Sequence, residues 1–394
     1  MSGAERPLTG TGGRAVPGAG AGAGPVRRVA VVGAGLVGGS VALAAREAGI
    51  DRVVLTDQDP DVRARARELG LAHEVLDELS EAVRDADLVV IAIPSHFVAA
   101  IALDVANAAP MQAIITDVAS LKSELVPEVE DLFELHRLNP ARFVGGHPMA
   151  GSEQSGPGAA DGSLFQGATW VLTPTKRTDH RALQELSGVL RSLGARVLAL
   201  PPDRHDALVA VVSHLPQVAA SCLADVAGEA VATSGQAVLA VAGGGFRDTT
   251  RIAASDPQLW RDILEGNRQA VLDALDRYRA RLDELRVALA EDDSDGLVAL
   301  LDRASQARRQ LVDKERATRL VDVVVPLDDR PGTLAESTTA LGEAGINIED
   351  LAMRHAAAGD RGALLVRVEE PAARRALEAL EQRGLHAHLE YDEA

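Results

Sequence analysis

The chain has little of several features that would assign it to particular classes of protein. Its 394 residues contain one cysteine, Cys222. No disulfide can therefore form within the chain, which fits a reducing cytosol, and the apolar neighbours of Cys222 predict a core residue rather than a nucleophile. No run of 18 or more consecutive apolar residues occurs, so we expect no membrane span.

Positive charge is also scarce. The formal net charge is −18 and the isoelectric point is about 5.0, which argues against nucleic acid or anionic membranes as partners but leaves room for a local basic pocket. The length suggests two or three domains, and 46% hydrophobic residues suffice for their cores. Residues 1–25 are rich in glycine and alanine and lack the apolar segment of a signal peptide, so we expect a disordered tail there.

A glycine-rich motif lies between a predicted strand, 27–32, and a helical pattern, 41–48. Its spacing, Gly33-x-Gly35-x-x-Gly38, is the dinucleotide-binding fingerprint in its proper context. Gly33 permits a tight turn, Gly35 lets the pyrophosphate approach, and Gly38 lets helix and strand pack closely. The expected cofactor contacts in this loop are Gly33, Gly35, Leu36, Val37 and Gly38, at a helix N-terminus that attracts phosphate.

A carboxylate ends the second predicted strand, 52–56. Asp57 follows Gly38 by 19 residues, the place of the ligand for the ribose 2′-hydroxyl. An acid there repels a 2′-phosphate, so NAD is favoured over NADP. The alternative role for Asp57 is a helix cap before Pro60, although Asp59 is better placed for that.

Strands and helices continue to alternate through the first half of the chain, which predicts a doubly wound, Rossmann-like α/β sheet. The further strands cover 86–94, 113–117, 143–146 and 169–172. Ligands of such sheets bind at the carboxyl ends of the strands. Pro94, Ser120 and His147 all follow strand ends, and we expect them on one rim. His96 either touches the cofactor or is a solvated loop residue.

His147 lies where glycines and a proline break a strand. Glycine on both sides lets the backbone turn and another molecule come close. Because an imidazole titrates near neutral pH, His147 is the natural general base, with capping of a turn as the alternative.

Helices dominate beyond about residue 200. Pro216 predicts a kink, and His205 and His214 are nine residues apart, a spacing that does not place them neatly on one face. Structural and catalytic roles stay open for both. A glycine-rich bend, 243–252, carries Arg251, which either pairs with Asp248 on the surface or, if buried, grips a carboxylate.

Two long helices complete this part of the chain. One starts after the cap at Ser255 and Asp256, carries Trp260 and is expected to run to about Arg286; the last covers about 295–311. Long helical hairpins of this kind rarely close a core alone, so they suggest an intertwined homodimer.

The tail, 320–391, reads as strand, helix, strand, strand, helix, strand. The strands are expected at 320–326, from 345, at 363–368 and at 386–391, with helices ending near Ala344 and covering 371–383. This is the ferredoxin-like βαββαβ order. A purely structural or dimerising module is the alternative to a regulatory one.

Four motifs make the chain from about Val29 to Leu311 resemble the prephenate and arogenate dehydrogenase family of tyrosine biosynthesis. They stand in the family's order at 116–120, 145–153, 212–216 and 246–253. The tail is similar to an ACT domain, on the motifs at 329–332 and 345–348. The resemblance implies NAD as cofactor, a small-molecule substrate, no metal and a cytoplasmic homodimer.

The resemblance also implies roles for single residues. His147 would accept the proton of the substrate hydroxyl, and Ser120 would orient that hydroxyl, His147 and the nicotinamide. Arg251 would grip a carboxylate and Glu153 would help to close or polarise the pocket, while His214 and Asp248 would support them. In the tail, an amino-acid effector such as tyrosine would meet Asp329, Pro331, Gly332 and Asn347.

The chain departs from some family members at Gln217, which follows the His-Leu-Pro triplet where they carry histidine. That residue would face the substrate side chain, which bears a keto group in prephenate and an ammonium in arogenate. A neutral amide suits either, so prephenate is favoured and arogenate is kept as the alternative.

Two readings outside the family stay open. Other β-hydroxyacid dehydrogenases resemble this layout but usually employ a lysine of the helical domain, and none stands between Asp203 and Ser305 here. A non-catalytic regulator that senses NAD and an amino acid would keep the glycine loop and the tail but would not need His147. We expect the domain boundaries 1–25, 26–199, 200–315 and 320–391.

Overall fold

The architecture comes from a computed structural model of the chain. It describes residues 26–151, 154–235, 237–317, 320–327, 333–355 and 362–390. The disordered N-terminal segment expected at 1–25 lies outside the described residues.

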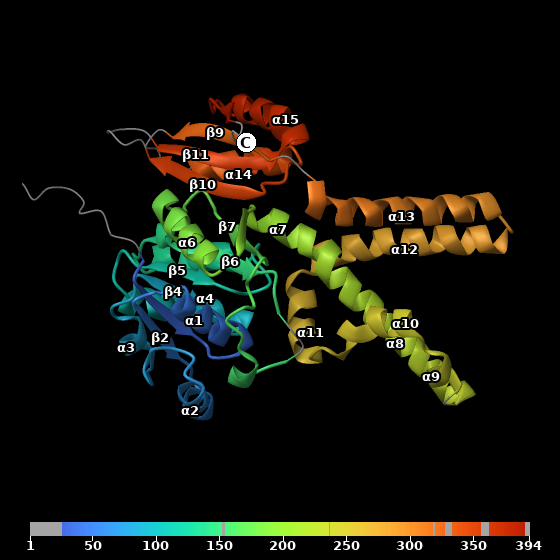
Figure 1. The fold of residues 1–394 in the computed structure, drawn as a ribbon, viewed down its shortest axis with the longest axis horizontal. Helices are drawn as coiled ribbons and strands as arrows, with labels where there is room; N and C mark the ends of the chain where they lie inside the picture. The colour runs from blue at the N-terminus through green and yellow to red at the C-terminus, as the bar shows by residue number, and fades with distance from the viewer. Residues whose placement is uncertain are drawn as a thin grey trace, which may run out of the picture.

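The first half of the chain forms an eight-stranded sheet in the order β3-β2-β1-β4-β5-β6-β7-β8 (Figure 1). Neighbouring strands are parallel except β6 and β7, which are antiparallel. This is the predicted doubly wound arrangement, extended by an antiparallel step. The strands are β1 (Arg28–Val32), β2 (Arg52–Thr56), β3 (Glu74–Val75), β4 (Leu88–Ile91), β5 (Ile114–Asp117), β6 (Phe143–Pro148), β7 (Thr169–Thr173) and β8 (Arg196–Ala199).

Helices cover both faces of this sheet, which is why its central strands are apolar throughout rather than alternating. Val29 and Val31 pack into one core cluster, whereas Ala30 and Val32 pack into another on the opposite face. The helices are α1 (Leu36–Glu47), α2 (Pro60–Glu68), α3 (Leu79–Val83), α4 (Ser95–Ala108), α5 (Leu125–Leu135) and α6 (His180–Ser192), with short 3-10 turns at Pro140–Arg142 and Pro157–Ala159.

The helical region begins with α7 (Pro202–Val209), a π-helical turn (Ala210–His214) and α8 (Leu215–Ser234). Figure 1 shows α12 and α13 as an antiparallel hairpin that projects from the sheet, while α8 and α9 project in another direction. The remaining elements are α9 (Ala237–Val241), α10 (Gly244–Thr250), a 3-10 turn (Arg251–Ala254), α11 (Pro257–Gly266), α12 (Arg268–Ala290) and α13 (Ser294–Ala317).

Three expectations for this region are wrong. The segment expected as a bend, 243–252, is helical from Gly244 onward, because glycine costs a helix only about 1 kcal/mol and the Thr249 hydroxyl donates back to the Gly245 carbonyl. The helix expected up to about Arg286 is interrupted at Asn267. Cys222 is exposed rather than buried, because the apolar face that carries it on α8 is not covered within the described part of the chain.

The helix from Pro202 to Thr233 bears on the expectation of no membrane span. By length and composition alone it could cross a membrane. Of its most apolar window, 28% is buried within the described part of the chain. Counting consecutive apolar residues missed it because single polar residues interrupt the run. Some of these polar residues are buried against the rest of the chain, His205 and His214 among them. This part of the helix therefore packs inside the protein.

The tail forms a separate antiparallel sheet with the order β10-β11-β9-β12. The element order is the predicted βαββαβ. The second strand starts at Asp350 rather than near Gly345; Ile346 and Ile348 are buried before it in a segment without strand pairing. The elements are β9 (Leu320–Leu327), α14 (Thr333–Glu343), β10 (Asp350–His355), β11 (Gly362–Glu369), α15 (Glu370–Gln382) and β12 (His388–Glu390).

The tail rests on the Rossmann-like sheet through β10, which contacts β8 and α6. Figure 1 shows β10 directly above α6. Arg191 of α6 donates to the Asp350 carboxylate at 2.5 Å and to the Leu351 carbonyl. The tail therefore contacts the Rossmann-like part of the chain directly.

Candidate active site

The glycine loop after β1 has the geometry that its sequence requires. Gly33 has a φ of +101°, and a Cβ there would lie 2.2 Å from the Ala92 carbonyl oxygen. A Cβ on Gly38 would lie 1.9 Å from the Gly33 carbonyl oxygen, so loop and helix touch. By contrast, nothing lies within 4 Å of a Cβ on Gly35. The loop therefore has open space at the glycine that the pyrophosphate would approach.

Asp57 is tied to this loop from the end of β2. Its Oδ2 accepts from the backbone N–H of Ala34 at 2.8 Å, and its Oδ1 accepts from the N–H of Asp59 at 3.0 Å. The cap of α2 is Asp59, whose carboxylate accepts from Asp61 N–H at 2.8 Å. The capping role considered for Asp57 is thus filled by Asp59, as the sequence indicated.

A fully buried ion pair lies at the end of β5, and its carboxylate also bonds β6. Lys122 Nζ contacts the Asp117 carboxylate, and both side chains have no exposed surface. Asp117 also accepts from the N–H of Gly146 at 3.0 Å and from that of Ala119 at 2.9 Å. Burial lowers the pKa of Lys122, and the attraction of Asp117 opposes this shift. The pair fixes the strand end that carries His147.

His147 projects from β6 toward the start of the helical region. Its Nδ1 lies 2.9 Å from Nε2 of His205 on α7, with the two rings at 70°. Burial holds the pKa of His147 well below its usual 6.5, and the neighbouring His205, Lys122 and His214 add to the effect. His147 is therefore neutral at neutral pH and able to accept a proton.

His205 is held in turn by its neighbour in sequence. His205 Nδ1 lies 2.7 Å from Oδ1 of Asp206, and the two residues are 1% and 4% exposed. The Asp206 carboxylate also accepts from the backbone N–H groups of Lys122 and Ser123. Burial raises the pKa of Asp206, but the hydrogen bonds from His205 and Ser123 outweigh it and leave the pKa lowered. Asp206 is accordingly an anion that links α7 to the loop after β5.

His214 joins the same cluster because of the π-helical turn. At about 100° per residue, nine α-helical residues would place it opposite His205. The wider turn at Ala210–His214 changes that phase. His214 Nδ1 lies 3.2 Å from Nδ2 of Asn267, which also donates to the Asp206 carbonyl at 2.8 Å. Burial lowers the pKa of His214 to about 4, although the Asp206 charge opposes this.

Gln217 is buried one turn further along, and its Nε2 donates to the Ile252 carbonyl at 3.0 Å. This bond joins α8 to the 3-10 turn that begins with Arg251. Arg251 itself is exposed, as is Asp248 on α10. The structure therefore brings Gln217 next to the Arg251 turn but does not bury Arg251.

The other candidate residues lie around this cluster or outside the described part of the chain. Ser120 is partly buried in the loop between Asp117 and Lys122, and Pro94 is exposed at the N-terminus of α4. His96 faces the helical region, with Nδ1 3.8 Å from the Asp262 carboxylate. Glu153 and the tail residues Asp329, Pro331 and Gly332 lie outside the described residues. Asn347 is exposed and donates to Glu349 at 2.5 Å.

Sequence reasoning did not single out Lys122, Asp206 or Asn267. Asp206 had at most one signal, its place directly after His205, since the start of α7 is polar and an acid there does not stand out. Lys122 stands in the loop after β5, five residues after its partner Asp117. Asn267 stands at a break between helices, and its partners Asp206 and His214 are far away in sequence. Nothing local marked either residue.

Comparison with known proteins assigns the family. The models of the prephenate dehydrogenase nucleotide-binding domain and dimerization domain match residues 41–199 and 201–303. Prephenate dehydrogenase of Bacillus subtilis (strain 168) is 32% identical over 329 residues, 82% of this chain and 87% of that protein. Cyclohexadienyl dehydrogenase of Zymomonas mobilis is 35% identical over 286 residues, 72% of this chain and 96% of that protein.

A solved structure agrees with these relatives. The crystal structure of prephenate dehydrogenase from A. aeolicus, in complex with hydroxyphenyl propionate and NAD+, is 31% identical. It superposes with a TM-score of 0.66 over 72% of this chain and 98% of that one. On the two family models and these matches, the chain belongs to the prephenate dehydrogenase family.

Proposed function

We propose that the protein is an NAD-dependent prephenate dehydrogenase, which oxidises and decarboxylates prephenate to 4-hydroxyphenylpyruvate in tyrosine biosynthesis. The family is assigned above, and the observation that carries the proposal is the neutral imidazole of His147. It stands at the end of β6, on the rim where a doubly wound sheet binds its ligands. A general base is the group that this reaction requires of the protein.

The glycine loop and Asp57 fit NAD. The open space at Gly35, at the start of α1, accepts a pyrophosphate, and the Asp57 carboxylate at the end of β2 faces the same loop. Gly33, Gly35, Leu36, Val37 and Gly38 would hold the phosphates, Asp57 the ribose, and Pro94 and Ser120 the nicotinamide half. When bound, NAD supplies the acceptor for the hydride of the substrate carbinol carbon.

The protein has one proton to manage in the oxidation. His147 accepts it from the C4 hydroxyl of the substrate, whose O–H electron pair becomes the second bond of a carbonyl. The C1–carboxylate bond then breaks and CO2 leaves. Its electron pair enters the ring, the carbonyl pair moves onto oxygen, and the phenolate so formed takes the proton back as the ring becomes aromatic. Because aromatisation drives the reaction, the protein contributes mainly orientation, which we assign to Ser120 for the hydroxyl.

Substrate binding is assigned to the helical region. Arg251 would bind a substrate carboxylate, with Asp248, His214 and Glu153 in support. Gln217 would face the side chain, where its neutral amide suits the keto group of prephenate. Arogenate, with an ammonium there, is the second candidate, and the cyclohexadienyl name of one relative specifies the ring that both share.

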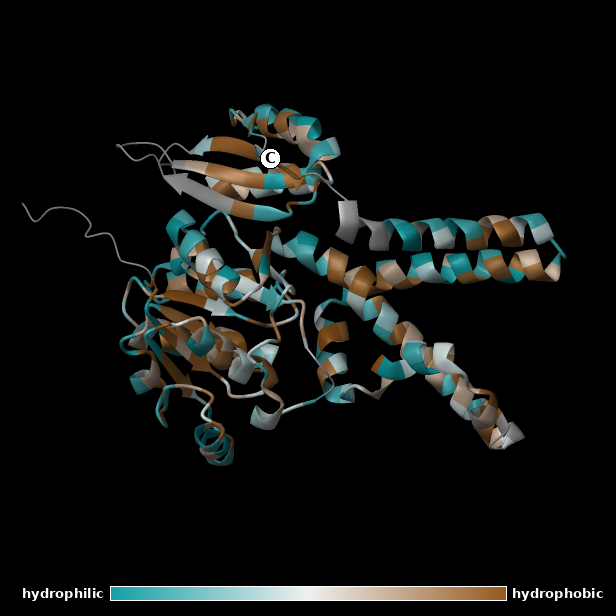
Figure 2. Cartoon of the chain, viewed as in Figure 1, coloured by the Kyte–Doolittle hydropathy of each residue, from teal (hydrophilic) through white to brown (hydrophobic). Residues whose placement is uncertain are grey.

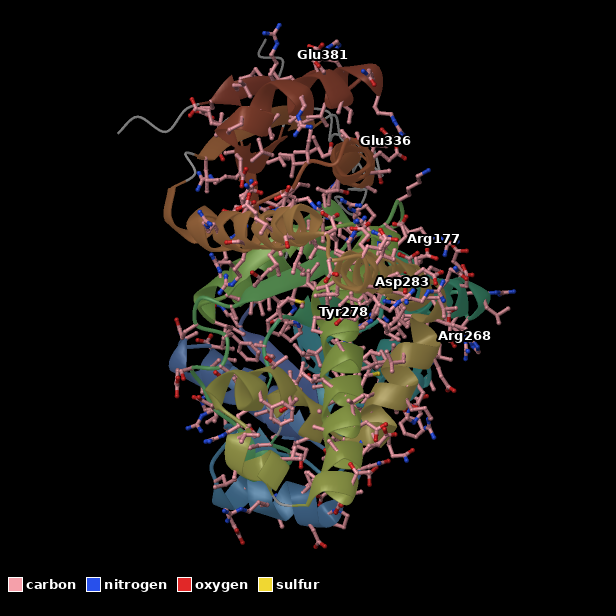
Figure 3. All side chains as sticks on the ribbon, turned by 90° about the vertical axis from the view of Figure 1, so that its right-hand side faces the viewer. Arg177, Arg268, Tyr278, Asp283, Glu336 and Glu381 are labelled. Atoms are coloured by element: carbon pink, nitrogen blue, oxygen red, sulfur yellow. The ribbon has the colours of Figure 1, made fainter. Side chains whose placement is uncertain are left out.

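We also propose that two copies pair through the helical region. Figure 2 shows brown, apolar residues along both the long helix and the projecting hairpin. In Figure 3, which looks at the molecule from the hairpin side, Tyr278 and Asp283 lie on that hairpin. The large apolar side chains exposed on these helices include Val212, Leu223, Val226, Leu282, Leu289, Val298 and Leu301. A partner copy would cover them, as the name of the matched dimerization domain suggests.

The tail is proposed to be an ACT domain that binds an amino-acid effector, tyrosine being the first choice. Its support is the βαββαβ element order and the contact of Arg191 with Asp350 and Leu351, by which the tail could influence the nucleotide-binding sheet. Asp329, Pro331, Gly332 and Asn347 are the proposed contacts. We place the domains at 26–199, 200–315 and 320–391 and the protein in the cytoplasm.

The experiment that tests the function is NADH formation by the purified protein with NAD and either prephenate or arogenate, with and without tyrosine. Turnover of prephenate supports the proposal. Turnover of arogenate alone keeps the site and changes the substrate. Turnover of neither, with NAD still bound, contradicts the proposal and favours a non-catalytic regulator that senses NAD and an amino acid.

A further inference from the structure

One half-buried and two buried side chains form a continuous line from the rim of the sheet into the helical region. His147 Nδ1 meets His205 Nε2 at 2.9 Å, and His205 Nδ1 meets Asp206 Oδ1 at 2.7 Å. His147 belongs to β6, whereas His205 and Asp206 belong to α7. The line therefore crosses from one domain to the other.

The chemistry of these groups fixes which nitrogen of each ring carries its proton. Ionised Asp206 can only accept, so His205 Nδ1 must donate to it. A neutral His205 then has a lone pair on Nε2 and accepts from His147 Nδ1. His147 is thereby left with a lone pair on its own Nε2, the nitrogen free to face a substrate. A base needs this tautomer, because the other one presents an N–H to the substrate hydroxyl and cannot accept its proton.

We propose that His205 and Asp206 are positioning residues that hold His147 in the tautomer of a general base. The inference rests on the proposed function, in which His147 accepts the substrate proton. When His147 becomes an imidazolium, its Nδ1–H still points at His205, whose Nδ1–H points at the Asp206 anion. The new positive charge is thus stabilised by an aligned line of hydrogen bonds, and no proton needs to move along it.

A second feature keeps Asp206 from rotating out of this line. Its Oδ2 accepts from Ser123 N–H at 2.8 Å and from Lys122 N–H at 3.2 Å, while Oδ1 accepts from Lys122 N–H at 3.0 Å. The loop after β5 therefore orients the carboxylate, and α7 presents it to His205. The loop that carries Ser120 and the helix that carries His205 are joined at the same carboxylate.

His214 carries the opposite tautomer, which completes the pattern. Asn267 Nδ2 donates to the Asp206 carbonyl, so this nitrogen is a donor, and the same nitrogen faces His214 Nδ1. His214 Nδ1 must accept, and its proton lies on Nε2. One imidazole of the cluster thus presents a lone pair and the other an N–H.

Replacing Asp206 by asparagine would reverse the direction of these hydrogen bonds, so that each donor becomes an acceptor. The backbone N–H of Ser123 bonds Oδ2 alone and that of Lys122 is within reach of both oxygens, so the amide oxygen of the introduced asparagine would take the Oδ2 position and accept from both. Its amide nitrogen would then face His205 and donate to Nδ1. His205 would carry its proton on Nε2 and donate to His147 Nδ1, which would place the His147 proton on the nitrogen that faces the substrate.

The direct test is the tautomer of His147 in ligand-free protein, read from long-range 1H–15N spectra of 15N-histidine-labelled samples at pH 7.5. The resonances of His147 are assigned by their loss in His147→Asn. We expect the Nδ1–H form in the wild type and the Nε2–H form in Asp206→Asn. An Nε2–H form in the wild type, or the same tautomer in both proteins, would overturn the proposal.

Kinetics supply the second readout. Asp206→Asn should lower kcat about 100-fold or more, in the range of a lost general base, with the Kd for NAD and the thermal midpoint near wild type. Raising the pH should not restore kcat, because the defect is a misplaced proton rather than an extra one. His205→Gln, whose amide can donate to Asp206 and accept from His147, should keep kcat within about 10-fold.

A double variant separates positioning from simple damage. In His205→Leu/Asp206→Asn no imidazole transmits the inverted pattern, so His147 should again populate both tautomers and kcat should rise above that of Asp206→Asn alone. If the double variant is no more active than Asp206→Asn, or if kcat falls only together with NAD affinity and thermal midpoint, Asp206 is structural. Failure of the wild type to turn over prephenate or arogenate would refute the proposed function, while the spectra would still decide the tautomer.

Discussion

His205, Asp206 and His214 are at most 4% exposed, whereas α10 and the turn Arg251–Ala254 contain no buried residue. Both regions carry residues proposed for one reaction. The first is held by hydrogen bonds from the Rossmann-like sheet, α7 and Asn267; the second is joined to the first through Gln217 and the Ile252 carbonyl. The part of the site around His147 and its partners is therefore complete within one chain. The part around Arg251, proposed to bind a substrate carboxylate, is exposed.

This difference separates two kinds of function. A base must keep one protonation state and one orientation, and burial provides both. A residue that grips an incoming carboxylate has to be reached by solvent before substrate binds. Exposed apolar residues of α8 lie beside this side of the chain, so a partner copy is expected to complete it.

The largest effect is expected on the buried side. His147→Asn removes the proton acceptor while keeping a polar side chain of similar size, and kcat should fall about 10²–10⁴-fold. NAD affinity, measured by fluorescence or calorimetry, should stay near wild type, because His147 lies on β6 and not in the glycine loop. Wild-type turnover in this variant would remove His147 from the mechanism and favour the sensor reading.

On the exposed side, Arg251→Ala should act on binding. Loss of a charged hydrogen bond of about 1.5–3 kcal/mol raises the KM for prephenate about 10- to 100-fold and leaves the KM for NAD nearly unchanged. Arg247→Ala is the matched control, since Arg247 is an exposed arginine one helical turn earlier on α10. Equal effects on both substrates, or equal effects of the two variants, would contradict Arg251 as the carboxylate ligand.

Much of the buried half could be predicted from the sequence, because local patterns mark it. The glycine spacing, Asp57 and the strand ends at Ser120 and His147 follow from the alternation of strands and helices. The partners of these residues could not be predicted in the same way. The ion pair of Asp117 with Lys122 depends on where the chain goes after β5, and the place of His214 in the cluster depends on a π-helical turn that no local signal at Ala210–His214 announces.

The exposed half was harder to predict for a different reason. Local rules treat three successive glycines at 243–245 as a bend, but the segment forms α10. The position of Cys222 was misjudged because an apolar helix was taken to be buried within its own chain. Where a second copy supplies the covering surface, apolar sequence indicates burial in the assembly, and a single chain shows that surface as exposed.

The free energy of unfolding of the protein should depend on pH through His214. The unfolded chain protonates His214 near 6.5, but the folded chain does so only near 4. Between these values the unfolded state binds more protons, so stability falls as the pH falls. For this residue alone the loss from pH 7 to pH 5 is about 2 kcal/mol.

Urea unfolding at fixed protein concentration measures this loss. His214→Gln is the control, because its amide can still accept from Asn267 but does not titrate. The control should lose about 2 kcal/mol less than the wild type over the same interval. An equal loss in both proteins would mean that His214 does not remain neutral in the fold.

The smallest effect is expected at Asp57, where the fold and the proposed ligand share one carboxylate. Asp57→Asn keeps an oxygen that can accept from Ala34 N–H but removes the charge that repels a 2′-phosphate, whereas Asp57→Ala removes both. Losing a hydrogen bond of about 1.5 kcal/mol between the carboxylate and the ribose should weaken NAD binding about 10-fold in the alanine variant. The ratio of kcat/KM for NAD to that for NADP should fall in both variants, because both lose the charge. If the ratio stays at the wild-type value in both while NAD weakens only in the alanine variant, Asp57 serves the loop and not the ribose.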